Sequence, residues 1–126
     1  GMGRTAEGLK EGLKKLKEVR KEFEKELFIP GDKEGMNVEL DKAIRLYDFI
    51  TMGELVAYDA LNRNESCGGH FREEYQTEEG EAKRDDENYF YVACWESQGS
   101  DEKEPVLLKE PLVYEAIKVQ TRNYKS

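Results

Sequence analysis

The segment from Val38 to about Asn64 constrains the fold most, because its apolar residues are spread too widely for a helix that is covered on one side. Their intervals of three and four residues predict a helix about 40 Å long, at about 1.5 Å per residue. A surface helix needs an apolar stripe only about 100° wide. Two stripes occur here: Leu40, Ile44, Tyr47, Leu55, Tyr58 and Leu61, and Leu46, Phe49, Ile50, Met52, Val56, Ala57 and Ala60. This helix therefore needs partners on two sides.

The preceding segment supplies only one such partner. Apolar residues recur at helical intervals from Leu9 to Leu27, Thr5 is a good N-cap, and Glu7 suits the first turn. The other face carries mostly Lys and Glu, which is typical of a solvated surface. We expect one amphipathic helix from Thr5 to Leu27, then a loop that ends at Asn37, the N-cap of the next helix.

After the second helix the pattern changes to turns and strands. Gly68 and Gly69 predict a helix cap and a turn, and residues 77–87 are polar and loop-like. Residues 88–97 (NYFYVACWES) predict a strand, and residues 105–114 (PVLLKEPLVY) its return strand in a hairpin. Pro111 places part of this return strand at a sheet edge or past the paired region.

Charge and composition exclude several classes of function. The 126 residues carry 20 basic and 28 acidic side chains, a net charge of −8, which argues against nucleic-acid binding and against adsorption to an anionic membrane. No apolar run approaches the roughly 20 residues that span a bilayer. The start of the chain shows no secretory signal, so Cys67 and Cys94 are expected to be reduced thiols.

The residue types with reactive side chains do not form a recognisable catalytic or metal site. Cys67, His70 and Cys94 are the only soft ligand candidates for zinc, which needs three or four ligands. A nucleophilic pair of Cys67 and His70 would need an orienting group and an oxyanion hole. Adjacent carboxylates are usually solvated in so acidic a chain, and no phosphate-binding glycine motif occurs. Taken alone, the residues favour a structural module with a polar turn that contacts something.

Two blocks of sequence carry a family resemblance. "ALNRNESCGGHFREEY" followed by "RDDENY" resembles the C-terminal signature of the flavoprotein subunit of succinate dehydrogenase and fumarate reductase, to which L-aspartate oxidase is related. The matching positions are Arg63, Glu65, Ser66, Gly68, His70 and Arg72, and then Arg84, Asp85, Asp86, Glu87 and Asn88. Arg122 and Tyr124 resemble the end of the family pattern. Cys67 and Tyr89 depart from it, standing where the family usually has arginine and tryptophan.

The resemblance implies a mainly α fold, in which antiparallel helices of a truncated three-helix, spectrin-repeat-like bundle are followed by a β-hairpin and an extended tail. We expect a single domain over 1–126, with the bundle part at 5–66, the motif turn and polar loop at 67–88, and the hairpin and tail at 89–126. The parent protein would interconvert succinate and fumarate with FAD. This chain would contain no catalytic, cofactor-binding or metal-binding residue, and the matched positions would be structural.

The resemblance also implies partners and a location. The upstream FAD-binding and capping domains and an iron–sulfur subunit would be the partners, without direct membrane insertion. The complex would lie at the cytoplasmic, inner face of a bacterial cell membrane and serve electron transport and the tricarboxylic acid cycle. Glu65, Arg72 and Arg84 would close the motif turn. His70 would be a hydrogen-bonded anchor, and the alternatives are a proton carrier or a supporting role near the flavin or the iron–sulfur subunit.

Two interpretations of the whole chain remain. The first is a non-catalytic piece of a flavin oxidoreductase, and the second is a stand-alone interaction module derived from such a domain. Gly1 and Met2, as an expression remnant or an internal start, fit the first interpretation. The direction of the reaction is left open. The uncovered side of the second helix further predicts a two-fold dimer of this chain, in which the contact substitutes for native packing.

Overall fold

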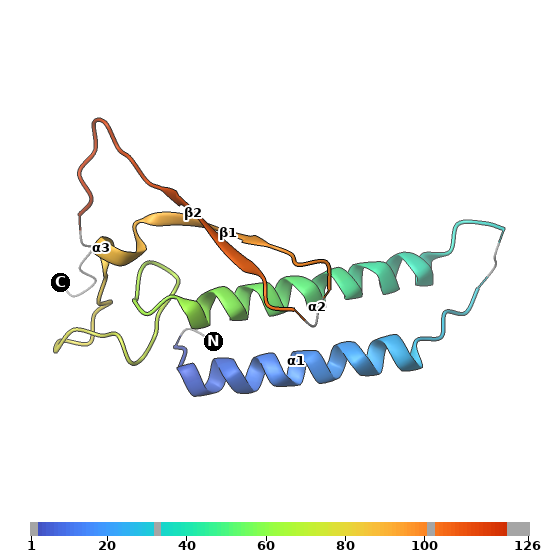
Figure 1. The fold of residues 1–126 in the computed structure, drawn as a ribbon. Helices are drawn as coiled ribbons and strands as arrows, with labels where there is room; N and C mark the ends of the chain where they lie inside the picture. Colours follow the sequence, from blue (N-terminus) through green and yellow to red (C-terminus); the bar gives the residue numbers. More distant parts are fainter. Residues whose placement is uncertain (1–2, 32–33, 101–102, 121–126) are drawn as a thin grey trace. The chain divides into compact units, whose positions relative to one another are not determined.

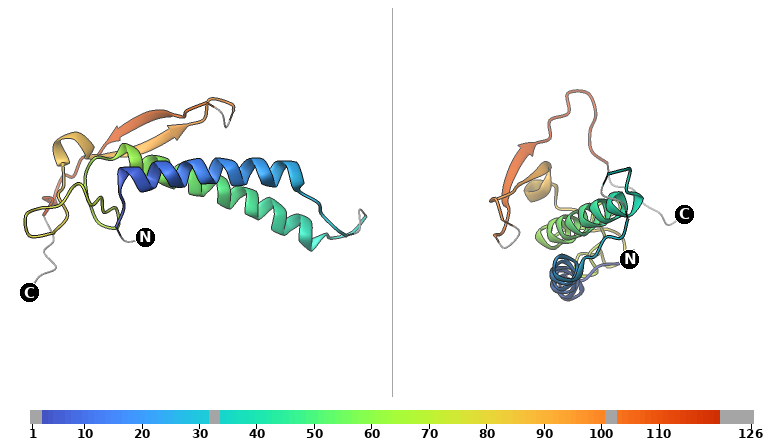
Figure 2. Two further views of the ribbon diagram at one scale, coloured as in Figure 1. Left: turned by 90° about the horizontal axis from the view of Figure 1, so that it is seen from below. Right: turned by 90° about the vertical axis from the view of Figure 1, so that its right-hand side faces the viewer.

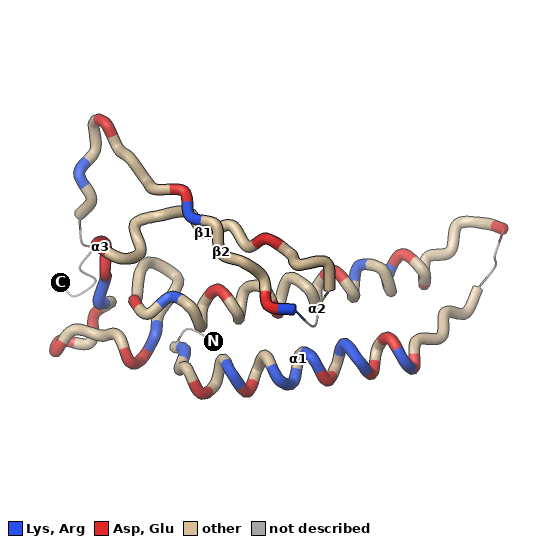
Figure 3. Tube along the Cα trace, viewed as in Figure 1, with Lys and Arg blue, Asp and Glu red and all other residues tan. Residues whose placement is uncertain are grey.

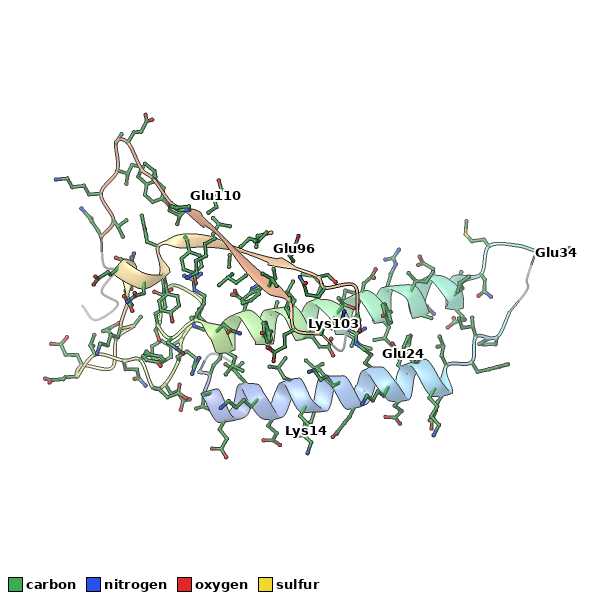
Figure 4. All side chains as sticks on the ribbon, viewed as in Figure 1. Lys14, Glu24, Glu34, Glu96, Lys103 and Glu110 are labelled. Atoms are coloured by element: carbon green, nitrogen blue, oxygen red, sulfur yellow. The ribbon has the colours of Figure 1, made fainter. Side chains whose placement is uncertain are left out.

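The two long helices form where the apolar spacing predicts them. In the computed structural model, which describes residues 3–31, 34–100 and 103–120, helix α1 comprises Ala6–Glu26 and helix α2 comprises Val38–Asn62 (Figure 1). Figure 3 shows Lys, Arg, Asp and Glu distributed along the whole length of α1, in accord with its expected solvated face. In Figure 4 the side chain of Lys14 lies on the side of α1 that faces away from α2.

Both helices begin at side-chain caps. The hydroxyl of Thr5 accepts a hydrogen bond from the N–H of Gly8 at 3.1 Å, and the amide oxygen of Asn37 accepts one from the N–H of Leu40 at 3.1 Å. The first N–H groups of a helix lack intrahelical acceptors, so each cap satisfies one of them. Both N-caps predicted from the sequence are therefore confirmed.

Helices α1 and α2 pack side by side as an antiparallel pair, which both views of Figure 2 show. The rings of Phe23 and Tyr47 lie 6.2 Å apart between them. A Cβ added at Gly53 would lie 3.8 Å from the Leu16 side chain, an ordinary packing distance. Arg20, which is buried, crosses the interface and donates to Glu54. The pair is thus held by both apolar and ionic contacts.

A β-hairpin follows, as predicted. Strands β1 (Tyr91–Glu96) and β2 (Val106–Pro111) pair antiparallel, with Cys94 opposite Leu108. Pro111 is the last paired residue of β2, which agrees with its predicted place at the limit of the pairing. The register puts Glu96 and Glu110 on one face of this ribbon, and both side chains are labelled there in Figure 4. Helices followed by a hairpin confirm the mainly α fold class.

Two local predictions are wrong. Tyr89, expected in the hairpin, ends the one-turn helix α3 (Asp86–Tyr89), because the Asp85 side chain accepts from the N–H of Asn88 at 3.1 Å and starts a helical turn. Gly68 and Gly69 do not cap α2, which ends earlier, at Asn62, although they do form a turn. The matched Arg122 and Tyr124 lie outside the described residues.

The chain consists of two compact units, one ending at Asn62 and the other beginning at Arg63. Ile50 and Ala60 are the only buried apolar side chains among the described residues. Buried polar side chains outnumber them: Arg20, Glu65, Ser66 and Arg72. Buried polar groups therefore form part of the interior of each unit, Arg20 in the first and Glu65, Ser66 and Arg72 in the second. That a single domain spans 1–126 stays a prediction.

Candidate functional site

The candidate site is the motif segment, residues 63–88, which opens with a tight turn around two glycines. The N–H of Cys67 donates to the carbonyl of His70 at 2.8 Å, and the N–H of His70 donates back at 3.0 Å. Gly68 has a φ of 57°, a backbone conformation that side-chain-bearing residues rarely adopt. The reciprocal pair closes a hairpin turn, so the glycine at 68 has a structural reason.

Ser66 closes the base of this turn. Its side chain is fully buried, and its hydroxyl both donates to the Arg72 carbonyl at 3.1 Å and accepts from the Arg72 N–H at 2.8 Å. The N–H of Ser66 donates to the carbonyl of Lys83 at 2.9 Å. One small residue therefore ties together three stretches of the motif segment, and its hydroxyl is occupied by structural bonds.

Arg63 and Glu65 form a partly buried ion pair. The Arg63 guanidinium donates to one Glu65 oxygen at 3.1 and 2.6 Å, and to the Tyr89 carbonyl at 2.8 Å. It also lies over the rings of Tyr89 and Tyr91, at 5.6 and 5.4 Å from their centroids. The second Glu65 oxygen accepts from the N–H of Asp85 at 3.3 Å. Glu65 thus links the first block of the motif to the second.

His70 and Arg72 both meet the carbonyl of Arg63. The Nε2 atom of His70 lies 3.1 Å from this oxygen, and an Nη1 donor of Arg72 reaches it at 3.4 Å. A carbonyl oxygen only accepts, so this contact requires the His70 tautomer that carries a proton on Nε2. Arg72 is buried, lies over the Tyr75 ring at 5.4 Å, and donates to Glu74 at 3.1 Å. The geometry supports the anchoring role predicted for His70.

Residues of the second block form hydrogen bonds with one another and with Gln120, at the end of the described chain. Arg84 donates to Asp86 at 3.0 and 2.6 Å and to the carbonyl of Gln120 at 3.3 Å. The hydrogen bond to Asp86 raises the pKa of the Arg84 guanidinium, which further stabilises its charged form. Asp85 accepts two bonds from the side-chain amide of Asn88, at 3.1 and 2.9 Å. All four residues have structural partners.

The same spacing recurs in three ion pairs. Each arginine donates to the carboxylate two residues later: Arg63 to Glu65, Arg72 to Glu74, and Arg84 to Asp86. In an extended chain, residues two apart project to the same side, which brings such a pair within reach. Glu65, Arg72 and Arg84, which were expected to close the turn, therefore each pair with an opposite charge two residues away. The repeated Arg-x-Asp/Glu spacing is the sequence signal that would have revealed them.

Three residues of the site were absent from the predicted set. Glu74 occurs only within the first quoted block, Tyr89 was noted only as a departure from the family pattern, and Tyr91 only as part of the predicted strand. Glu74 accepts from Arg72, whereas Tyr89 and Tyr91 present their rings to Arg63. Aromatic residues that follow a basic motif are compatible with many folds, so only the tertiary structure identifies these ring contacts.

The side chains of the motif segment form interlocked hydrogen bonds and ion pairs. Among the residues that the structure describes, no three His, Cys, Asp or Glu side chains gather as a metal site would require. Cys67 is half-buried and Cys94 exposed, and neither forms a disulfide with a described residue. Within the same part of the chain, none of the helices has the length and apolar character needed to cross a bilayer.

Solved structures of known proteins have a fold similar to that of this chain. The FrdA chain of E. coli quinol fumarate reductase, in a mutant form, has a similar fold, with a TM-score of 0.76 and 24% identity over 96% of this chain. A quinol–fumarate reductase structure with menaquinol molecules matches with a TM-score of 0.74 and 25% identity over 94%. This chain covers 20% and 19% of those chains, so it spans about a fifth of their length.

The sequence profile of one protein family matches almost the entire chain, from residue 1 to residue 124. That family is described as the fumarate reductase flavoprotein C-term. The match includes both motif blocks, α1, α2 and the hairpin. This chain therefore belongs to the family of C-terminal domains of fumarate reductase flavoproteins.

Proposed function

We propose that this chain is the C-terminal structural part of a flavoprotein subunit that interconverts succinate and fumarate with FAD. Membership of the family and the fold shared with quinol–fumarate reductase chains support this assignment. Because the chain spans about a fifth of those proteins, the activity belongs to the longer parent polypeptide. FAD and the dicarboxylate would bind to the parts of the parent that precede this domain.

The observation that carries the structural role is the internal engagement of the motif segment. Glu65, Ser66 and Arg72 are all at most 2% exposed, and each is bonded to other groups of the same segment. A residue that acts on a substrate needs an accessible atom, whereas a buried residue bonded on several sides stabilises a fixed shape. The motif segment would thus give the domain a rigid end.

This rigid end would serve packing within the enzyme. The partners we propose are the FAD-binding and capping domains of the same polypeptide and the iron–sulfur subunit of the complex. The complex would lie at the inner face of a bacterial cell membrane, without insertion of this domain, and would serve electron transport and the tricarboxylic acid cycle. The strongly acidic surface, with a net charge of −8, favours protein partners over anionic lipid.

Substitution of His70 in the full-length parent tests this role. His70→Ala removes the contact to the Arg63 carbonyl, so we expect a lower melting temperature, with kcat per bound flavin within about twofold of the unmodified enzyme. His70→Gln offers an amide N–H that can replace the lost donor, so it should recover part of the stability.

The pH dependence of kcat distinguishes a structural role of His70 from a role as proton carrier. If His70 carries a proton in the reaction, both variants lose a large part of kcat and the profile loses one titration. That outcome would contradict the structural role. Glu73→Ala, a substitution at an exposed residue of the same segment, is the matched control and should change neither stability nor rate.

A further inference from the structure

Helix α2 carries an exposed seam with heptad spacing. Its residues follow one another at alternating intervals of three and four: Lys42, Arg45, Phe49, Met52, Val56 and Asp59. Phe49 is 70% exposed, Met52 56% and Val56 53%. This spacing keeps a set of side chains on one side of a helix, which is how two helices pack along their length. Three large apolar side chains thus lie exposed at the centre of the seam, and exposed apolar patches often mark interaction surfaces.

The first helix does not cover this seam. The α2 residues that contact α1 include Tyr47, Thr51 and Glu54, which meet Phe23 and Arg20. At about 100° per residue, these three positions lie on roughly the opposite side of α2 from the seam. The seam is therefore a second face of α2, separate from the interface within the helical pair.

The charges at the two ends of the seam indicate which partner helix it can pack against, and in which direction. Its N-terminal end is basic, with Lys42 and Arg45, and its C-terminal end has the acidic Asp59. Arg45 lies seven residues before Met52, and Asp59 lies seven residues after it. If two copies pack antiparallel about a two-fold axis at Met52, each Arg45 lies opposite Asp59 of the other copy. A parallel pair would place Arg45 against Arg45, with repulsion.

The existing contact of Arg45 does not prevent this arrangement. Arg45 donates to Asp41 at 3.0 Å, with both side chains more than half exposed. Such exposed pairs contribute little to stability, so the guanidinium can turn toward a carboxylate on another copy at small cost. The exposed apolar centre then supplies affinity, and the terminal charges select the direction.

We propose that two copies of this 126-residue chain associate through the α2 seam, antiparallel, with Met52 on the two-fold axis. In a longer parent polypeptide the preceding chain would compete for the same face, so the dimer substitutes for packing within one molecule. This proposal does not depend on the enzymatic assignment, because it uses only the apolar and charged residues of α2.

Sedimentation of the chain and of two matched variants tests the surface. Phe49→Glu places a charge in the centre of the seam and should raise the dimer Kd at least about tenfold. Ile44→Glu makes the same kind of change at an exposed residue on another side of α2 and should leave Kd unchanged. Monomer alone at micromolar concentration, or an equal effect of both variants, would overturn the proposal. Unchanged far-UV circular dichroism verifies that both variants fold.

Disulfide trapping tests whether the two α2 helices pack antiparallel or parallel. In a background with Cys67→Ser and Cys94→Ser, chains with Arg45→Cys are mixed with chains with Asp59→Cys and oxidised mildly. The antiparallel arrangement predicts that the mixed disulfide between positions 45 and 59 predominates. Like-with-like disulfides as the main product would indicate a parallel pair, and a random mixture of products would indicate no defined contact. Either of these results rejects the proposed register.

Discussion

At the scale of single residues, the second unit is stabilised by polar groups whose bonds are made inside the chain. Burial of a carboxylate or guanidinium costs several kcal/mol unless its partners are present. Glu65 meets this requirement with donors from Arg63 and from the backbone of Asp85. Ser66 meets it by exchanging two bonds with the backbone of Arg72. Substitution of such buried residues should destabilise the fold, whereas substitution of exposed charged residues in the same segment should have little effect on stability.

Glu65→Gln should lower the free energy of unfolding of the second unit by about 3 kcal/mol, because it leaves the Arg63 guanidinium without its counter-charge. Urea unfolding followed by the fluorescence of Trp95, the single tryptophan, reports on this unit. Asp86→Asn is the control, since it removes the same charge from a side chain that is 47% exposed, and it should cost at most about 1 kcal/mol. Equal losses would show that burial of Glu65 is unimportant.

Ser66→Ala should cost about 2 kcal/mol in the same measurement. It removes one hydroxyl but leaves both a buried N–H and a buried carbonyl of Arg72 without that partner. Ser97→Ala removes a hydroxyl that accepts from Gly99 at an exposed turn, and we expect a change below about 0.5 kcal/mol. A Ser66→Ala variant as stable as the Ser97 control would refute this account.

At the scale of elements, the pair of α1 and α2 combines a thin apolar interface with one buried cation. Arg20 is 5% exposed, donates to Glu54 at 2.6 Å and to Thr51 at 3.1 Å, and lies 5.0 Å from the centroid of the Tyr47 ring. Removal of one member of a buried pair is costly, whereas replacement of both by apolar residues is often neutral or stabilising. The Arg20–Glu54 pair thus orients the helices while contributing little net stability, although loss of Arg20 alone leaves the Glu54 carboxylate without its partner.

Arg20→Ala should therefore destabilise the helical pair by about 3–5 kcal/mol, whereas the double variant Arg20→Met with Glu54→Leu should stay within about 1 kcal/mol of the original chain. Thermal unfolding followed by far-UV circular dichroism at the helical signal measures both. If the double variant loses as much as the single one, the ion pair contributes net stability and the prediction fails.

At the scale of the whole molecule, the exposed apolar surface of this chain is large relative to its buried core. Phe49, Met52 and Val56 are each more than half exposed, whereas Ile50 and Ala60 are the buried apolar residues among those described. Its relatives of known structure are about five times longer. Both facts favour an element that completes its packing against other polypeptide and does not perform chemistry alone.

The isolated chain should therefore bind no FAD and should catalyse neither succinate oxidation nor fumarate reduction. The sequence contains no glycine motif of the kind that holds a dinucleotide phosphate. An absorption spectrum after incubation with FAD and gel filtration measures binding, and the parent enzyme under the same conditions is the positive control. A flavin spectrum that elutes with the chain would contradict the prediction.

Much of the local structure was predictable because its causes are local. Thr5 and Asn37 cap helices through bonds to residues three positions on, and the apolar spacing in α1 and α2 is a property of the chain itself. Tyr89 was assigned wrongly because two local preferences compete there. Its aromatic neighbours favour a strand, but the Asp85 side chain favours a helical turn, and the sequence does not say which is stronger.

By itself, the sequence determined the helices, the hairpin, the glycine turn at Gly68 and the family, because each depends on spacing within a short stretch. The tertiary structure decided which groups meet across distance. It shows that Glu65 contacts Asp85, that Arg63 lies over two tyrosine rings, and that Arg20 crosses to Glu54. In a chain with 20 basic and 28 acidic residues, many pairings have similar local energy, so only the packed backbone selects among them.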